Sequence, residues 1–509
     1  MEIINSVMTW LMKKRIHQID LFIKYPIDVQ REVLNHLVET AEDTAFGKEH
    51  QFNSIRDYED FKQRVPIVTY EQFYPYVERV MKGEQQVLWP SKIKWFAKSS
   101  GTTNAKSKFI PVSSEALEDC HFKGGKDLLS IYVNNYPETK VFSGKNLAIG
   151  GSQQINQMDE NADSYFGDVS AVLMKNLPFW AQFSRTPSLD IALMDDWEKK
   201  IEKIAQATKD ENITSMAGVP TWTIFLLQRI VEIKGAKNIL EVWPNLELFI
   251  HGAVSFTPYR SLFKDLIPSE QMHYLETYNA TEGFFGIQDQ KDSTEMLLML
   301  DYGIFYEFIP TEDFEKDDPR TMDLSQVEVD KNYAVVISTN SGLWRYKIGD
   351  TIKFTSVNPF RFVISGRTKH FINAFGEELI VENAEKGIAM ACEKTQALVD
   401  DFTAAPRYIG DGQKGCHEWI IEFSKKPDDM DLFTHTLDTS LREINTDYDA
   451  KRTKNIAVER PVVHAVEPGT FYSWMKSRGK LGGQNKVPRL SNNRDYVEEL
   501  LKMLRQETY

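Results

Sequence analysis

Short, continuous apolar runs that end in glycine or a small polar residue are the feature that most constrains the fold of this chain. Such runs occur at Lys145–Gly151, Leu246–Gly252 and Tyr333–Thr339, and their length is typical of strands buried in a sheet. Helical stretches, such as Trp197–Ala207 and Pro220–Ile233, alternate with them. This alternation predicts an α/β fold with mostly buried β-sheets flanked by helices.

The pattern changes at both ends of this region. The first ninety residues are mainly helical, beginning with an amphipathic helix over Met1–Ile23, and a break falls near Ser365–Asn373. A chain of 509 residues exceeds the size at which one core normally keeps growing. Beyond the break we expect a small α+β domain with helices at Val381–Cys392 and Asp431–Glu443, a strand at His417–Phe423 and a glycine-rich segment at Ser477–Gly483.

Charge and cysteine content exclude several classes of function. The net charge of -14 would repel a nucleic-acid backbone, and no long basic patch overrides it. The three cysteines, like His251 and His417, are too scattered for a disulfide framework or a zinc site. A metal would therefore be held by carboxylate and phosphate oxygens. The most apolar later stretch, Ile224–Ile233, is too short to cross a bilayer, and we expect a soluble cytoplasmic protein.

A loop rich in hydroxyl and lysine side chains is the first candidate for chemistry. It runs from Ser99 to Lys108 with the sequence SSGTTNAKSK and follows a strand-like run, Lys92–Ala97. Backbone N–H groups, hydroxyls and lysines in such a loop can surround phosphate oxygens. The loop matches neither common glycine-rich nucleotide motif. On its own, this stretch is more typical of a solvated surface loop.

Two later segments could complete a nucleotide site. Tyr278–Gly283 (YNATEG) places an aromatic ring, a hydroxyl and a carboxylate after a strand-like run, which suits an adenine and a magnesium ion. Trp344–Asp350 (WRYKIGD) supplies a carboxylate that we expect at a tight turn, where it can accept hydrogen bonds from ribose hydroxyls. Taken singly, a core tyrosine and an ordinary turn aspartate remain the simpler interpretations.

The order of these segments resembles the successive signatures of the adenylate-forming superfamily. The chain reads SSGTT…K, then Y-x-x-TE, then YKIGD, then Gly366–Lys369 (GRTK) followed by Gly376–Glu378 (GEE). Within that superfamily, Val219–Trp222 (VPTW) and Gly483–Arg489 (GQNKVPR) are similar to the Gretchen Hagen family of auxin-responsive promoter proteins, the acyl acid amido synthetases. The resemblance extends over nearly the whole chain.

The resemblance implies an architecture and a two-step reaction. A large N-terminal domain, residues 1–368, would bind ATP and the acid, and a small mobile domain, residues 369–509, would rotate about a hinge near 366–373. The acid's carboxylate would first attack the α-phosphorus of ATP with Mg²⁺ present and release pyrophosphate. The amine of an amino acid would then attack the acyl-adenylate and release AMP. Phosphoryl transfer of this kind depends mainly on positioning and charge neutralisation.

The resemblance also assigns roles to individual residues. The phosphates of ATP would be held by Ser99, Ser100, Thr102, Thr103 and Lys108. Thr281 and Glu282 would contact the α-phosphate, with Glu282 also on the magnesium. The adenosine would be bound by Tyr278, by the backbone of Gly252 and Ala253, and by Asp350 and Arg367 near the ribose. Lys369 would be the hinge, and Lys486 would reach the α-phosphate during adenylation. Without the resemblance, Lys486 reads as an exposed loop residue.

Substrate choice is less constrained by the sequence. Val219, Trp222 and Phe179 could wall an apolar acid pocket, although aromatic residues at helical spacing are more often core. Ala105 and Ser107 depart from the superfamily loop. A thioester-forming ligase that uses coenzyme A and a non-catalytic nucleotide-binding protein stay open as alternatives. The expected partners are a small carboxylic acid and an amino acid, with no nucleic acid and no membrane. The oligomeric state stays open, with a monomer favoured.

Overall fold

The computed structural model describes residues 2–99, 108–150, 156–157, 163–194, 196–254, 256, 259–314, 316, 318–367, 371–409, 414–453, 458–478 and 487–506. The chain divides into two compact units. Unit 1 contains Met1–Ser99, Lys108–Ala253 and Phe263–Thr368, and unit 2 contains the described residues of Val254–Leu262 and Lys369–Tyr509.

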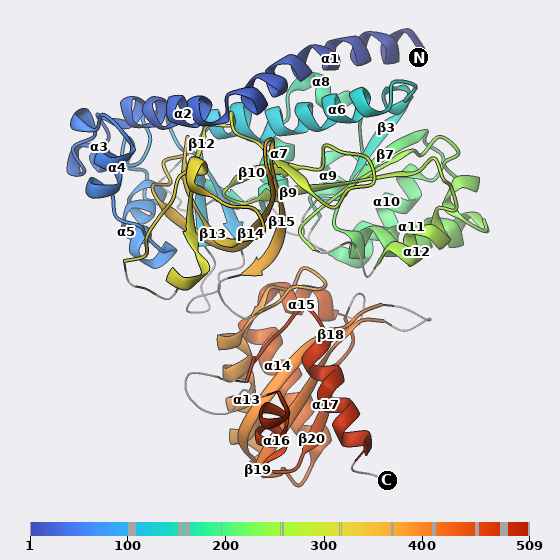
Figure 1. Ribbon diagram of the computed structural model, residues 1–509. Coiled ribbons are helices and arrows are strands. Elements are labelled where there is room, and N and C mark those ends of the chain that lie inside the picture. The colour runs from blue at the N-terminus through green and yellow to red at the C-terminus, as the bar shows by residue number, and fades with distance from the viewer. Residues whose placement is uncertain are drawn as a thin grey trace. The chain divides into compact units, whose positions relative to one another are not determined.

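Unit 1 is built on one long twisted sheet of 11 strands, in the order β12-β13-β14-β15-β11-β10-β9-β8-β7-β3-β6 (Figure 1). The strands from β9 to β6 are parallel, and those from β12 to β9 are antiparallel. The parallel strands are β3 (Lys145–Ala148), β6 (Arg185–Thr186), β7 (Ile213–Ala217), β8 (Leu248–His251) and β9 (His273–Ala280). The others are β10 (Gly283–Ile287), β11 (Met296–Leu298), β12 (Ile304–Pro310), β13 (Asn332–Thr339), β14 (Tyr346–Val357) and β15 (Phe360–Arg367).

Helices cover this sheet. In Figure 1, α1 and α6 lie side by side, and α10 and α11 lie beside the parallel strands. The helices of unit 1 are α1 (Glu2–Lys24), α2 (Pro26–Ala41), α3 (Ala45–Glu49), α4 (Tyr58–Arg64), α5 (Tyr70–Met81), α6 (Lys123–Asn135), α7 (Val169–Lys175), α8 (Phe179–Phe183), α9 (Leu189–Ala192), α10 (Trp197–Thr208) and α11 (Pro220–Lys234). A π-helix, η2 (Ala116–Phe122), leads directly into α6, and α12 (Arg260–Leu266) spans the boundary between the units.

Local sequence explains where the helices beside the parallel strands begin and end. Pro220 occupies the first turn of α11, where its missing N–H loses no helical bond, and Gly235 ends the helix in the left-handed conformation at φ 60°. The carboxylate of Asp196 accepts a hydrogen bond from the Lys199 N–H and so caps α10. Because of these local signals, the bounds of α10 and α11 nearly coincide with the helical ranges that the sequence predicts.

A second, four-stranded sheet of unit 1 has the order β2-β1-β5-β4. Its strands are β1 (Trp95–Ser99), β2 (Lys108–Val112), β4 (Asn156–Gln157) and β5 (Tyr165–Gly167). β1 and β2 are antiparallel, and Ser99 pairs directly with Lys108. The predicted phosphate loop therefore connects the two strands of a hairpin, and its first and last residues are held in register.

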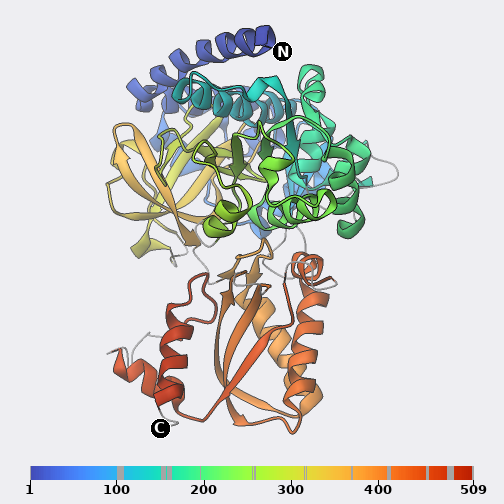
Figure 2. The same ribbon diagram turned by 90° about the vertical axis from the view of Figure 1, so that its right-hand side faces the viewer.

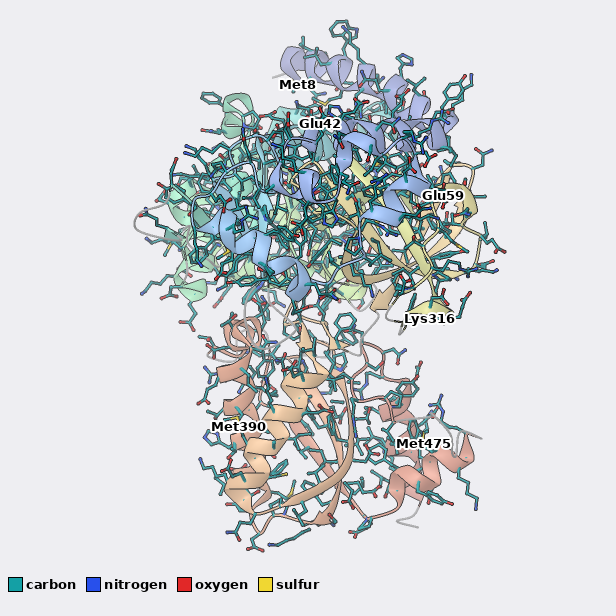
Figure 3. All side chains as sticks on the ribbon, turned by 90° about the vertical axis from the view of Figure 1, so that its left-hand side faces the viewer. Met8, Glu42, Glu59, Lys316, Met390 and Met475 are labelled. Carbon is teal, nitrogen blue, oxygen red and sulfur yellow. The ribbon has the colours of Figure 1, made fainter. Side chains whose placement is uncertain are left out.

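Unit 2 has a three-stranded sheet with helices on both faces (Figure 2). The sheet order is β18 (Leu398–Arg407), β19 (Cys416–Lys425) and β20 (Val462–Val466), with a short pair β16 (Phe371–Ile372) and β17 (Leu379–Ile380). The helices are α13 (Val381–Thr395), α14 (Met430–Ile444), α15 (Thr446–Arg452), α16 (Thr470–Ser477) and α17 (Asp495–Gln506). Met390 of α13 and Met475 of α16 lie on opposite flanks of the unit (Figure 3).

These observations confirm the predicted fold class, a large α/β part with buried sheets followed by a small α+β part. The core of unit 1 joins the N-terminal helices to the sheet through buried aromatic side chains such as Phe46, Phe73 and Trp344. Within the described residues, no helix is both long and apolar enough to cross a membrane.

Candidate functional site

The carboxyl ends of the parallel strands carry the residues predicted to line the adenine. Gly252 and Ala253 follow β8 directly, and β8 lies beside β9. A Cβ on Gly252 would lie 2.5 Å from the Thr277 carbonyl oxygen of β9, so only glycine fits there. Ala253 has a φ of 69°, a conformation uncommon for a residue with a side chain. Ligands of open α/β sheets bind outside this edge.

Tyr278 and Asp350 meet directly, although they come from different parts of the sequence. The Tyr278 hydroxyl on β9 donates a hydrogen bond of 2.5 Å to Oδ2 of Asp350 on β14. The Tyr278 ring packs against Phe285 and Phe362 and is 7% exposed. The contact joins two of the predicted nucleotide segments.

The predicted tight turn at Asp350 is wrong. Asp350 lies inside β14, where the pairing of β14 with β13 shifts register between the Ala334–Thr351 and Val336–Lys347 pairs. Gly349 at this irregularity has a φ of 98°, which favours glycine. The glycine that suggested a turn in the sequence instead forms a β-bulge, and such a bulge re-aims the side chain next to it.

Thr281 and Glu282 form the two-residue connection between β9 and β10. The strands close on both sides of it, with Ala280 opposite Gly283 and Asn279 opposite Phe284. Both connection residues are partly exposed. A hydroxyl and a carboxylate therefore stand at the carboxyl end of a parallel strand, three or four residues beyond Tyr278. Oxygen donors of this kind suit a phosphate and a hard cation.

Contacts at and just before the start of α5 connect β2, which follows the phosphate loop, to β14. The Phe109 N–H donates to the Tyr70 hydroxyl at 2.7 Å, and Lys108 Nζ lies 5.7 Å from the centroid of the Tyr70 ring. Two residues before Tyr70, Val68 bridges to Tyr346, and the Lys347 N–H donates to the Val68 carbonyl at 2.9 Å. The base of the loop is thus tied to the strand that carries Asp350.

The residues predicted for the acid pocket have mixed surroundings. Val219 precedes α11, and the N–H of neighbouring Gly218 donates to the Ile250 carbonyl of β8 at 3.1 Å, so Val219 lies at the same sheet edge. Trp222 is only 2% exposed, which suits the core interpretation weighed for it from the sequence. Phe179 begins α8, and Arg367 ends β15 opposite Asp350. The side chains of Phe179 and Arg367 lie outside the described part of the structure.

Several predicted site residues lie wholly outside the described residues. These are Ser100, Thr102 and Thr103 of the phosphate loop, Lys369 at the predicted hinge, and Lys486. Ser99 and Lys108, which flank the loop, are described and partly buried.

Sequence reasoning missed one group beside the site, His121 of η2. It is 6% exposed, and burial lowers its pKa to about 4 although a hydrogen bond to the Asn279 side chain favours the charged form. Asn279 belongs to the YNATEG segment, but His121 lies 158 positions earlier in the chain. No local pattern marks a histidine whose partner is so distant in sequence.

Comparison with protein families matches nearly the whole chain to one family. Residues 15–272 match the GH3 family N-terminal domain, residues 297–367 the GH3 family central domain, and residues 382–495 the GH3 family C-terminal domain. The three matches confirm the family that the order of the motifs resembles.

Individual relatives are distant but cover most of the chain. The indole-3-acetic acid-amido synthetase GH3.3 of Arabidopsis thaliana is 22% identical, over 91% of this chain and 89% of its own. A solved structure of the GH3.15 acyl acid amido synthetase superposes with a TM-score of 0.61 at 18% identity, covering 96% of each chain. A 2-hydroxyisobutyryl-CoA ligase in its thioesterification state gives a TM-score of 0.55 at 12% identity, covering 94% of this chain and 92% of its own. The structural likenesses show a shared fold.

Proposed function

This chain belongs to the GH3 family, and on that premise we propose that it is an ATP-dependent acyl acid amido synthetase. In the first step a carboxylate oxygen of the acid attacks the α-phosphorus of ATP, pyrophosphate leaves, and an acyl-adenylate forms. In the second step the amine of an amino acid attacks the acyl carbonyl, and the C–O bond breaks to release AMP. The observation that carries this proposal is the Tyr278–Asp350 contact beside the Gly252 edge of the sheet.

The nucleoside would occupy the edge formed by β8, β9 and β14. Gly252 lets the chain after β8 pass close to the Thr277 carbonyl of β9, and the Tyr278 ring lies on that same neighbouring strand. The Asp350 carboxylate, which Tyr278 orients, is proposed to accept hydrogen bonds from the ribose hydroxyls. Arg367, opposite Asp350 on β15, is proposed near the same ribose.

The phosphates would extend from this edge towards the hairpin loop. Thr281 and Glu282 are proposed to contact the α-phosphate, and Ser99, Ser100, Thr102, Thr103 and Lys108 the outer phosphates. Lys108 contributes positive charge at the base of the loop, which lies next to Tyr70. Lys486 is proposed to stabilise the negative charge that develops at the α-phosphate during the first step.

A magnesium ion fits the donor set at this place. The Glu282 carboxylate is partly exposed at the connection between β9 and β10, where the proposed phosphates would lie. Mg²⁺ is usually held by one or two carboxylates together with substrate phosphates and water. When bound, the ion would neutralise phosphate charge. Glu282 would orient it, and Thr281 would hold a phosphate oxygen through its hydroxyl.

The two units are proposed to act as domains, residues 1–368 and 369–509. Rotation of the smaller domain about Lys369, within the proposed hinge near 366–373, would separate the adenylation step from the attack by the amine. The acid would lie between the α-phosphate and the sheet edge around Val219, with Trp222 and Phe179 as a further wall of its pocket.

The test is to mix the protein with ATP, magnesium and a panel of carboxylic acids, and to follow acid-dependent release of pyrophosphate. Amino acids or coenzyme A are then added, and the product is identified by mass spectrometry. We expect pyrophosphate release with at least one acid and an amide with an amino acid. A thioester in place of the amide would replace the proposal with a coenzyme A ligase. Absence of acid-dependent pyrophosphate would leave a non-catalytic nucleotide-binding protein.

A further inference from the structure

The helix α1 exposes large apolar side chains along one of its sides. They are Val7, Trp10, Leu11 and Leu21, with exposed fractions of 51%, 58%, 45% and 57%. Lys14 and Gln18, which are also exposed, lie between them in the sequence. Residues that are three, four or seven positions apart share one face of a helix. The six side chains therefore form a single stripe, here called the outer stripe: Val7, Trp10, Leu11, Lys14, Gln18 and Leu21.

The opposite side of α1 is fixed to unit 1. Ile19 and Phe22 are buried, and α1 packs against α6. Arg15 forms ion pairs with Asp127 of α6 at 2.7 Å and with Asp301 at 2.8 Å. The helix is thus held at the outside of unit 1, as Figure 1 shows. Four of the six residues of the outer stripe precede residue 15, where the family match begins, so the activity proposed from the family does not explain them.

Positive charge accompanies the outer stripe. α1 carries four basic and two acidic side chains, a net charge of +2, in a chain whose net charge is -14. Lys13 and Lys24 are exposed along one border of the stripe, where Asp20 offsets one charge. Within the stripe, Lys14 Nζ lies 3.6 Å from the centroid of the Trp10 ring. Exposed charges farther away than about 10 Å are largely screened by salt, so the local positive charge decides which partner fits here.

We propose that α1 binds a lipid surface that contains anionic headgroups, with the outer stripe at the boundary between headgroups and acyl chains. Helices that lie on membranes combine tryptophan and leucine on one face with lysines that reach the anionic headgroups. The sequence-based expectation of no membrane partner considered a membrane-crossing span, and a helix lying in the plane of the surface needs none. The inference is independent of the proposed function, since it involves neither ATP nor the acid.

A second copy of the chain fits the outer stripe less well. In a symmetric contact between two α1 helices, the ammonium group of Lys14 would be buried within an apolar stripe that contains no carboxylate. Burying a charge without a partner is costly. At a lipid surface, the apolar stem of Lys14 can pack among apolar groups while its ammonium group reaches the headgroups.

The experiment is co-sedimentation of the whole protein with vesicles of phosphatidylcholine alone and of phosphatidylcholine mixed with phosphatidylserine. We expect binding to the mixed vesicles to be stronger by about tenfold or more, and to weaken as salt is added, because each lysine near an anionic surface contributes roughly fivefold. The double substitution Lys13→Gln and Lys14→Gln should lower this binding by about tenfold. Trp10→Ser with Leu11→Ser should lower it by about tenfold or more through lost apolar contact. Thermal melting checks that both variants stay folded.

Tyr472 provides the matched control. It is an aromatic residue on α16, is 63% exposed and, like Trp10, has a lysine four residues later, but no other large apolar side chain of α16 is exposed. Tyr472→Ser should bind mixed vesicles as the wild type does. The inference is overturned if the wild type binds neither kind of vesicle, or if folded α1 variants bind as tightly as the wild type. A dimer that Trp10→Ser with Leu11→Ser dissociates in sedimentation equilibrium, without vesicle binding, would overturn it in favour of a second copy.

Discussion

At the scale of single residues, the carboxylate of Asp350 is the group on which nucleotide binding should depend most. It is held by the Tyr278 hydroxyl and is proposed to bind the ribose. Hydrogen bonds to a charged group contribute about 1.5 to 3 kcal/mol. Asp350→Asn should therefore raise the KM for ATP by roughly tenfold to a hundredfold, measured by pyrophosphate release. Tyr278→Phe, which loses only the orienting hydroxyl, should raise it by a few-fold.

A control for this prediction is Asp289→Asn. Asp289 accepts a hydrogen bond of 2.7 Å from Arg361 in the same unit, and it is not one of the residues proposed to bind the nucleotide. Its loss should leave the KM for ATP unchanged. If the KM for ATP is unchanged in both Asp350→Asn and Tyr278→Phe, the proposed ribose site is contradicted.

The sequence identified most of the described residues that meet at this edge but not the contacts between them. Tyr278 and Asp350 are 72 positions apart, so their pairing depends on strand order, which local patterns do not encode. The bulge at Gly349 was mistaken for a turn because both need a positive φ. His121 was missed because its buried, neutral state depends on packing against a distant strand.

At the scale of elements, Glu418 joins three parts of unit 2. On β19, its carboxylate accepts hydrogen bonds of 2.7 Å from His464 on β20 and from Arg494, which precedes α17. The hydrogen bond from His464 is the main cause that lowers its pKa to about 2, with Arg494 adding to it. Because the folded pKa is below the ordinary 4.5, this stabilisation is complete above about pH 4.5 and is lost as the pH falls towards 2.

Glu418→Gln should therefore destabilise unit 2 at pH 7, by at most about 3 kcal/mol. This difference in the free energy of unfolding between the variant and the wild type should shrink as the pH is lowered from 4.5 to 2.5. It is measured by urea denaturation at several pH values. The control Glu467→Gln removes an exposed bridge to Lys426 and should change stability little. A destabilisation by Glu418→Gln that is equal at pH 7 and pH 2.5 would contradict the assigned pKa shift.

Helices with clear caps and apolar periodicity were predicted closely, whereas strand pairing and the shortest strands were not. The predicted Pro220–Ile233 and Asp431–Glu443 correspond to α11 and α14 within one or two residues, because caps and apolar periodicity act locally. The sequence could not show that β13 is antiparallel to its neighbours whereas β3 and β8 are parallel to theirs, since the same kind of short apolar run predicts all three strands. The short strands β4 and β5 have too few residues for a recognisable pattern.

At the scale of the whole molecule, the order of the motifs carried more information than any one motif. The SSGTT loop alone was ambiguous, but its position ahead of YNATEG, YKIGD and the C-terminal segments indicated the family that the domain matches then showed. The identity of the acid and the amine is not encoded in that order. Relatives at 21 to 24% identity match over most of the chain, while substrate pockets depend on individual side chains.

The central claim is that an acyl-adenylate forms. It is tested most directly with a carboxylic acid that the protein accepts as substrate, labelled with ¹⁸O in both carboxylate oxygens. The labelled acid is incubated with the protein, ATP, magnesium and the acceptor amino acid, and the products are analysed by mass spectrometry. Because the attacking oxygen stays on phosphorus when the amine displaces AMP, we predict one ¹⁸O atom in AMP and one in the amide. Unlabelled AMP, or formation of ADP and labelled phosphate, would contradict the account.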